Sequence, residues 1–533
     1  MKKFLLLILA ASCLFIIKSN AQNVITVSGD ISSNTTWTNN NIYLLIGFVY
    51  VTNNAELTIQ EGTIIKGDKA TKGSLIITRG SKIWADGSVT RPIVFTSNEP
   101  AGLRSYGDWG GLIICGFAPI NDPAGEKVIE GGVDASKGLY GGTNPGDNSG
   151  ILRYVRIEFP GIAFMPNNEI NGLTLGGVGS GTIVDYVMVS YSGDDSFECF
   201  GGTVNLKHII AYRGLDDDFD TDFGYNGKNQ FLISIRDSNV ADISGSNGFE
   251  SDNDATGSLN NPITYPVYSN VTLIGPMKNA GTVINSNYKR AAHLRRSAKT
   301  SIFNSVFSGF PTGLLIDGAN TESAATNNQL QFQNNIIAGC TTPLSVSSGS
   351  TWDISAWFNQ PSYGNSILPS TTDLMLTNPF NYNTPDFTPL TGSPVLNSAA
   401  FTSTLLNNPF FDVVTFSGAI GSNDWTQGWT NFDCQNTDYI ITSVNSIKNN
   451  SNIHVYPNPA RSQTTISFNE ERTGTFSVKI MDLSGNLVRT FNNETLSKGE
   501  QIININLDGV SPGIYTISVS NDSGKFVNRL IIH

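Results

Sequence analysis

Apolar residues recur at every second position ahead of a series of glycines in the middle of the chain. A large apolar residue stands two places before each of these glycines, which are Gly161, Gly193, Gly214, Gly275, Gly309 and Gly339. In the first four copies another stands four places before, at Ile157, Val189, Ile210 and Val271. A period of two predicts strands that turn one face inward, and each glycine permits the turn that ends its strand.

The spacing of these glycines indicates how the strands are arranged. Successive glycines are 32, 21, 61, 34 and 30 residues apart, which fits coils of a little over twenty residues with insertions in some loops. Such coils bury their apolar faces only when they stack and pair edge to edge. A β-propeller would need a more even period of about 40 residues. The pattern therefore predicts an all-β fold, a right-handed parallel β-helix.

Composition agrees with many short strands and tight turns. The 533 residues include 53 glycines, only 14% are charged, and the net charge is −12. A negative balance makes nucleic acid and anionic lipid unsuitable partners, whereas cations and neutral polymers remain compatible.

The first residues read as an export signal. Met1-Lys2-Lys3 precede a 14-residue apolar run and then Ser19-Asn20-Ala21, which predicts a signal peptide over residues 1–21 with cleavage before Gln22. The run is shorter than the roughly 20 residues that span a bilayer, so we do not expect an integral membrane protein. After removal of the signal peptide four cysteines remain, Cys115, Cys199, Cys340 and Cys434. The sequence is compatible both with disulfide bridges between them and with buried free thiols.

Acidic residues gather in one stretch. Residues 192–254 hold 13 Asp and Glu against 4 Lys and Arg, so this stretch contributes −9 of the net charge. Two clusters directly follow Gly193 and Gly214, which predicts that they lie on adjacent coils, where carboxylates about 5 Å apart repel by about 3 kcal/mol per pair. A bound Ca²⁺, which takes six to eight oxygen ligands, would offset that repulsion. The candidate metal ligands are Asp194, Asp195, Asp216, Asp217, Asp218, Asp220, Asp222, Glu250, Asp252 and Asp254.

Two other interpretations of the acidic stretch remain open. It can be a solvated edge, neutralised in part by Lys207, Arg213 and Lys228. We expect the basic run at residues 289–296 to be a solvated loop that pairs with the acidic stretch. It can also be catalytic, since paired acids serve a glycoside hydrolase or polysaccharide lyase. Gly193-Asp194-Asp195 faintly resembles the GDD element of polygalacturonases, but no His-Gly or Arg-x-Lys follows. The parity of His208 predicts a core histidine.

Several segments together resemble a largely uncharacterised family of Bacteroidetes β-helix surface proteins. They are Thr36-Trp37, LTIQEGTIIKG (57–67), GDWGGL (107–112), GLDDDFDTDFG (214–224) and DWTQGWTNFD (424–433). The resemblance supports the fold and an extracellular location and implies no activity. It places the β-helix domain at residues 22–433, followed by a polar linker at 434–452.

The last 81 residues resemble the type A C-terminal sorting domain of the type IX secretion system. The motifs occur in order as VYPNPA (455–460), KIMDLSG (479–485) and PGIYTI (512–517). The resemblance implies a small immunoglobulin-like sandwich over residues 453–533, recognition by the type IX machinery, and attachment to the outer-membrane surface after the domain is removed.

These observations predict a secreted, surface-attached β-helix with a structural, adhesive or polysaccharide-binding role, stabilised by calcium. A polysaccharide lyase or glycoside hydrolase and a purely structural rod are the alternatives. No catalytic residue is assigned.

Overall fold

The chain forms two compact units. This computed structural model describes residues 23–165, 168–439, 454–470, 474–482, 486–496, 499–521 and 524–533; the expected signal peptide, residues 440–452 of the expected linker and part of KIMDLSG lie outside them. One unit is Asn23–Tyr439 and the other contains the C-terminal residues. The first therefore includes residues 434–439, which the sequence had assigned to the linker.

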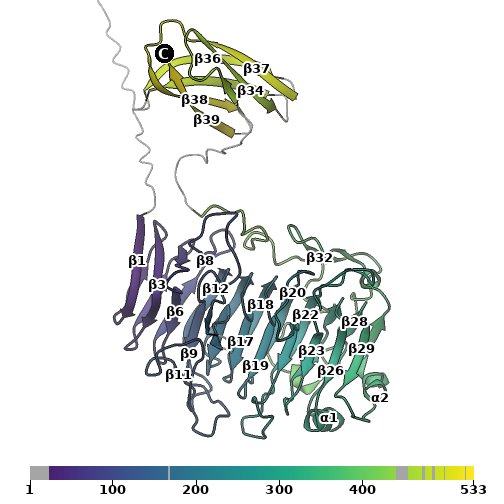
Figure 1. Cartoon of the computed structure of the whole chain (residues 1–533). Helices are drawn as coiled ribbons and strands as arrows, with labels where there is room; N and C mark the ends of the chain where they lie inside the picture. The colour runs from purple at the N-terminus through teal and green to yellow at the C-terminus, as the bar shows by residue number, and fades with distance from the viewer. Residues whose placement is uncertain are drawn as a thin grey trace, which may run out of the picture. The chain divides into compact units, whose positions relative to one another are not determined.

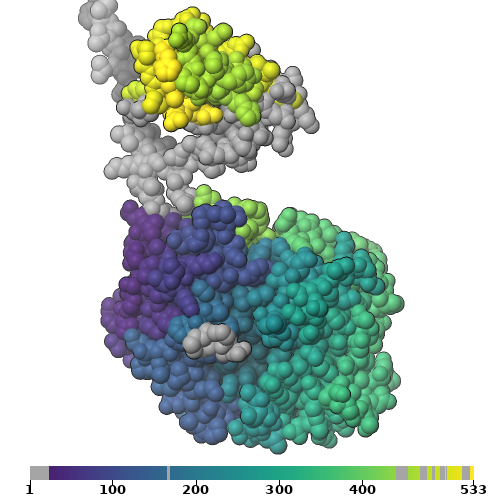
Figure 2. All heavy atoms as spheres, in the orientation of Figure 1, coloured from purple at the N-terminus to yellow at the C-terminus, as the bar shows by residue number. Residues whose placement is uncertain are grey.

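The first unit is a parallel β-helix, as predicted. One 26-stranded sheet winds through three ladders of parallel strands, and Figure 1 shows the strands side by side from β1 to β29. In Figure 2 the colour passes in sequence order from purple to green across this unit, as stacked rungs require.

Each rung contributes a strand, or half of a long strand, to each ladder. The first ladder contains β2 (Thr35–Trp37), β4 (Glu56–Ile59), β7 (Lys82–Asp86), the first halves of β12 (Gly150–Glu158), β16 (Ile183–Ser190), β18 (Asn205–Tyr212), β20 (Lys228–Ile235) and β22 (Val267–Ile274), then β24 (Ser301–Phe303) and β27 (Phe332–Gln333). The second contains the first halves of β1 (Asn23–Ile31) and β3 (Asn41–Val51), β5 (Ile64–Gly67), β8 (Ile93–Ser97), the second halves of β12 to β22, then β25 (Val306–Ser308), β28 (Ile336–Ala338) and β30 (Ser366–Leu368).

The third ladder carries the acidic residues discussed below. It contains the ends of β1 and β3, then β6 (Ser74–Ile77), β9 (Leu112–Cys115), β15 (Leu173–Gly176), β17 (Phe197–Phe200), β19 (Phe219–Asp222), β21 (Phe249–Ser251), β23 (Arg290–Leu294), β26 (Thr312–Ile316) and β29 (Thr342–Val346). Helix α1 (Ala319–Thr326) follows β26, and α2 (Ile354–Phe358) packs Trp357 and Phe358 against the interior of the last rungs.

Short elements occupy the loops and the end of this unit. The antiparallel pairs are β10 (Lys127–Val128) with β11 (Leu139–Tyr140), β13 (Ala163–Met165) with β14 (Asn168–Glu169), and β31 (Leu376–Asn378) with β32 (Asp386–Pro389). Three 3₁₀ turns are η1 (Pro361–Tyr363), η2 (Thr371–Leu374) and η3 (Thr404–Leu406).

The strands alternate less regularly than the sequence suggested. Long strands bend at a residue with positive φ, such as Tyr186 or His208, and the pairing skips that residue. A left-handed residue breaks the period of two. Ile157, Val189 and Val271 face the interior as predicted. Ile210 lies in an outer cluster together with Phe159, Tyr191 and Tyr212, which stand two places before their glycines, so the predicted orientation of these four residues was wrong.

The outer face of the second ladder is covered by the end of the same unit. Residues 401–439, here called the return segment, bring Trp429 and Cys434 against Tyr212 and Phe159. The ring of His208 stacks between Tyr186 and Phe231 at centroid distances of 4.2 and 5.2 Å, with Trp425 at its edge. His208 is therefore half-buried beneath this segment, and the prediction of a core histidine was wrong.

The C-terminal unit has two antiparallel sheets, which agrees with the predicted immunoglobulin-like sandwich. One contains β33 (His454–Tyr456), β34 (Gln463–Glu470) and β37 (Gly499–Asn506); the other contains β35 (Gly474–Met481), β36 (Leu487–Leu496), β38 (Gly513–Asn521) and β39 (Gly524–Ile532). Ile466 and Ile505 of the first sheet and Val478 and Ile517 of the second share one core.

Candidate metal site

The register of the third ladder aligns acidic side chains in a column. Glu198 of β17 pairs with Asp220 of β19, Asp220 pairs with Glu250 of β21, and Glu250 pairs with His293 of β23. Parallel strands lie about 4.8 Å apart, so each carboxylate adjoins the next. Pairing residues on β17 and β19 are 22 positions apart, one more than the distance between Gly193 and Gly214.

The turns that lead into these strands add two further pairs of aspartates. Asp194 and Asp195 precede β17, and Asp216 and Asp217 precede β19. The backbone N–H of Asp217 donates to Asp195 Oδ1 at 2.8 Å, which fixes one turn over the other. Turns and column together enclose a cavity of about 290 Å³ lined by Glu130, Asn171, Asp194, Asp195, Glu198, Asp216, Asp217, Asp220, Ser244, Gly245, Glu250 and Arg295. We call this cavity the acidic pocket.

Carboxylate oxygens in the pocket are close enough to share a cation. Among the described residues, three groups have ligand atoms that all lie within 4.8 Å of one another: Asp194, Asp195 and Asp216; Asp195, Glu198 and Asp220; and Asp217, Asp220 and Glu250. Ca²⁺ binds oxygens at 2.3–2.6 Å, so oxygens up to about 5 Å apart can contact one ion. These groups of acidic residues could therefore bind a metal ion.

Burial and mutual repulsion raise the pKa of most carboxyls in the pocket. Burial raises the pKa of Asp195 well above its ordinary value, and the charge of Asp217 adds to this. The pKa of Glu198 is raised by burial and by Glu130, and that of Asp220 by burial and by Glu250. Burial raises the pKa of Asp216 to about 6. Without a counter-charge these groups therefore keep their protons to a higher pH than exposed carboxyl groups do, and a bound cation would favour their ionised form.

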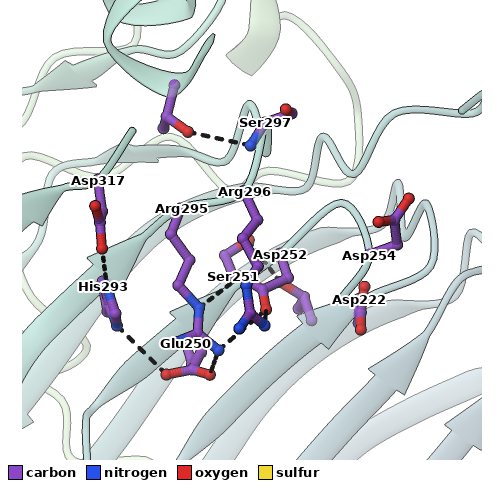
Figure 3. A network of polar contacts seen from close by, with 12 residues as sticks. Asp222, Glu250, Ser251, Asp252, Asp254, His293, Arg295, Arg296, Ser297 and Asp317 are labelled. Carbon is purple, nitrogen blue, oxygen red and sulfur yellow. Dashed lines mark hydrogen bonds and ion pairs between the residues drawn. The ribbon is translucent and has the colours of Figure 1, made fainter. Parts of the chain in front are cut away.

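Glu250 differs because the guanidinium of Arg295 is already paired with it and His293 lies beside it (Figure 3). It forms an ion pair with Arg295 and lies 3.4 Å from His293 Nδ1, and His293 Nε2 lies 3.0 Å from Asp317. Burial acts to raise the pKa of Glu250, but the hydrogen bond of His293 and the charge of Arg295 outweigh it and lower the pKa. The basic run therefore pairs with the acidic stretch, as one sequence interpretation held, although β23 is a buried strand and not a solvated loop.

Four of the ten predicted ligands lie outside the pocket lining. Asp218 is buried in an ion pair with Arg236 at 3.0 Å. Asp252 pairs with Arg295 at 2.7 Å and with Arg296 at 2.6 Å. Asp254 accepts hydrogen bonds from Thr256 and Ser258 in its own turn, and Asp222 accepts one from the backbone of Phe223. The structure places Asp194, Asp195, Asp216, Asp217, Asp220 and Glu250 together, and it separates Asp218, Asp222, Asp252 and Asp254 from them.

Six residues of the pocket lining were absent from the predicted ligand set, and three of them, Glu198, Glu130 and Asn171, carry carboxylate or amide oxygens. Glu198 stands four positions after Asp194, and its pairing with Asp220 could have been found from the coil length. Glu130 lies in the long loop between β10 and β11, and no pattern marks it. Asn171 precedes β15 and donates from Nδ2 to Glu198, and its buried Oδ1 has no hydrogen-bond partner.

The cysteines take no part in the pocket. All four in the described residues are free thiols, and Cys115, Cys199 and Cys434 are buried. Of the two alternatives left open by the sequence, the structure therefore has free thiols and not disulfide bridges.

Fold and pocket together define an acidic parallel β-helix joined to a β-sandwich. Residues 29–366 match the pectate-lyase-like β-helix domain, and the chain belongs to this family. Residues 454–533 match the secretion system C-terminal sorting domain. The protein is accordingly a β-helix exported by the type IX system and directed to the outer-membrane surface.

Comparison with individual proteins adds little to this assignment. No curated protein matches the chain. Among solved structures, the Dettilon tailspike protein is 10% identical with a TM-score of 0.21, and the match covers 59% of this chain and 62% of that one. For tailspike protein 2 of Escherichia coli O157:H7 bacteriophage CAB120 the identity is 11%, the TM-score 0.22, and the coverage 92% and 64%. The chain spans less than two thirds of either tailspike. Within the described residues, no helix is both long and apolar enough for a membrane span.

Proposed function

We propose that this protein is a surface-attached structural or adhesive β-helix that holds divalent cations, Ca²⁺ foremost, in the acidic pocket and binds a polysaccharide along its side. One observation supports this above all: carboxylates from adjacent rungs converge on a cavity of about 290 Å³ whose lining has one cationic side chain, Arg295.

A bound cation explains the pocket better than a solvated acidic edge does. Two carboxylates about 5 Å apart repel by about 3 kcal/mol at an effective dielectric of about 20, and solvent relieves this only where the groups are exposed. Asp195, Glu198 and Asp217 are buried. An ion among their oxygens turns that repulsion into attraction and lets Ca²⁺ tie adjacent rungs together.

The cation also offers a way to bind a polymer. Each group supplies three carboxylates, whereas Ca²⁺ takes six to eight oxygens. The remaining positions are available to water or to hydroxyl and carboxylate oxygens of a sugar. A stacked β-helix presents an extended side face, which suits a linear ligand.

Thermal unfolding in EGTA and in millimolar Ca²⁺ tests the cation. A ligand that binds only the folded state raises the midpoint, so we expect a rise of several degrees for the chain from residue 22 onward. In an Asp195→Asn variant the rise should be mostly lost, while Asp254→Asn should retain it. An equal midpoint in EGTA and Ca²⁺ for the unaltered chain would refute the proposal and favour a purely structural rod.

A polysaccharide lyase or glycoside hydrolase is the second candidate. Burial raises the pKa of Asp216 to about 6, near the value that suits a general acid, and other carboxylates adjoin it. In that case Asp216→Asn would abolish release of reducing or unsaturated sugar ends from acidic polysaccharides without changing the midpoint. Lack of turnover by the unaltered chain on a broad polysaccharide panel would argue against this candidate.

A further inference from the structure

The charges in the acidic pocket exceed what one cation can balance. Its lining has eight carboxyl groups and one guanidinium. If every group ionised, seven negative charges would remain, and a single divalent cation would still leave five. Shared protons reduce this excess, but only at a pH below the raised pKa values.

The excess is unevenly distributed along the rungs. At the end formed by Glu250, Arg295 already acts as an internal counter-charge. At the other end, around Asp194, Asp195 and Glu198, the described residues include no ion-pair partner for these carboxylates. A bound cation would therefore relieve the most electrostatic repulsion at the end of the pocket away from Arg295.

That end also contains an amide with an unsatisfied oxygen. Asn171 is 1% exposed, and its Nδ2 donates to Glu198 and, at 3.4 Å, to Glu130, so its side chain reaches into the pocket. Its Oδ1 is buried without a hydrogen-bond partner. A half-turn of the amide exchanges the two atoms and would present the oxygen to a cation beside Glu198.

We propose that the pocket binds two divalent cations side by side between the same two rungs, those of β17 and β19: one among Asp194, Asp195 and Asp216, and one among Asp195, Glu198 and Asp220 with the amide oxygen of Asn171. Asp195 belongs to both groups and bridges the ions. The third group shares Asp220 with the second, and its Glu250 is already paired with Arg295, so it takes no ion of its own. This inference rests on the proposed cation-binding function and adds the number and positions of the ions.

Counting the ions tests the proposal. Native mass spectrometry of the chain from residue 22 to 533, with Ca²⁺ added, should show two bound ions, and calorimetry gives their affinities. Asp216→Asn and Glu198→Gln should each leave one ion, because each removes a ligand of a different group. Asp195→Asn should weaken both by tenfold or more. Asp222→Asn is the matched control, because Asp222 lies two residues beyond Asp220 on β19 but outside the pocket, and it should keep two ions.

Each outcome has a defined meaning. One ion in the unaltered chain, or loss of both ions in Asp216→Asn and in Glu198→Gln alike, would overturn the two-ion arrangement and leave the cation function standing. No bound ion would overturn both. Thermal midpoints in EGTA exclude misfolding, since removing a repelled carboxylate should leave the variants at least as stable as the unaltered chain when no ion is present.

Discussion

Replacing Arg236 by methionine should destabilise the β-helix severely, whether or not calcium is present. The side chains of Arg236 and Asp218 are both fully buried, 3.0 Å apart. Arg236 also donates to the carbonyl oxygens of Gly214 and Asp216, and Ser234 donates to Asp218. Removal of the Arg236 guanidinium leaves the carboxylate of Asp218 buried and unpaired, which costs about 3–5 kcal/mol of folding free energy.

Equilibrium unfolding in urea measures the loss of unfolding free energy in Arg236→Met, and two further variants serve as controls for its cause. Arg236→Met combined with Asp218→Leu removes both charges and should recover much of the stability, because a neutral pair costs less than a lone buried charge. Arg153→Met is the surface control: its pair with Asp86 is 3.2 Å long, the side chains are 34% and 47% exposed, and the expected loss is below about 1 kcal/mol.

The pH and calcium dependence of the loss identifies its cause. Asp218 without Arg236 can escape charge burial only by taking up a proton, so the penalty of Arg236→Met should be smaller at pH 5 than at pH 8. It should be equal in EGTA and in Ca²⁺, because Asp218 lies outside the pocket. A loss below 1 kcal/mol, or a double variant less stable than the single one, would refute this reasoning.

Three other predictions follow from burial. Burial raises the pKa of Asp216 to about 6 and that of Asp222 to about 7, from about 3.8, so the folded state keeps protons that the unfolded chain has lost. In EGTA the thermal midpoint should therefore fall as the pH rises from about 4 to 7. A midpoint that rises over this range would contradict the prediction. Trp429→Ala should cost about 3–5 kcal/mol in urea unfolding and expose the return segment to protease, whereas resistance equal to that of the unaltered chain would disprove the packing role. Burial raises the pKa of three thiols, so at pH 8 they should react with Ellman's reagent only after denaturation, and rapid reaction of the native protein would count against Cys115, Cys199 and Cys434 being enclosed.

The sequence predicted the β-helix because period-two alternation reports directly on stacking. The sequence also predicted that the two acidic clusters lie on adjacent rungs, because the 21-residue spacing of Gly193 and Gly214 is within one residue of the 22-residue offset between paired residues of β17 and β19. Some predictions for individual side chains were wrong where the residues lie in turns outside the strands. Asp218 was predicted to be a metal ligand together with Asp216 and Asp217, but it lies just before β19 and is buried in an ion pair with Arg236.

Long-range partners could not be found from one sequence. Arg295 is 43 residues from Asp252, and Glu130 reaches the pocket from a loop with no repeat pattern. The return segment covers the second ladder with contacts such as Trp429 on Tyr154 and Tyr186, which no local periodicity encodes. Side chains on both faces of that ladder are consequently buried, and the apolar pattern alone does not say which face is the interior.

The most direct measurement is a crystal structure of the protein soaked in Ca²⁺, with anomalous scattering recorded at long wavelength. We expect two peaks in the acidic pocket, at 2.3–2.6 Å from carboxylate oxygens, with Asp195 contacting both. A pocket without anomalous density, or peaks only at Asp222, Asp252 or Asp254, would contradict it.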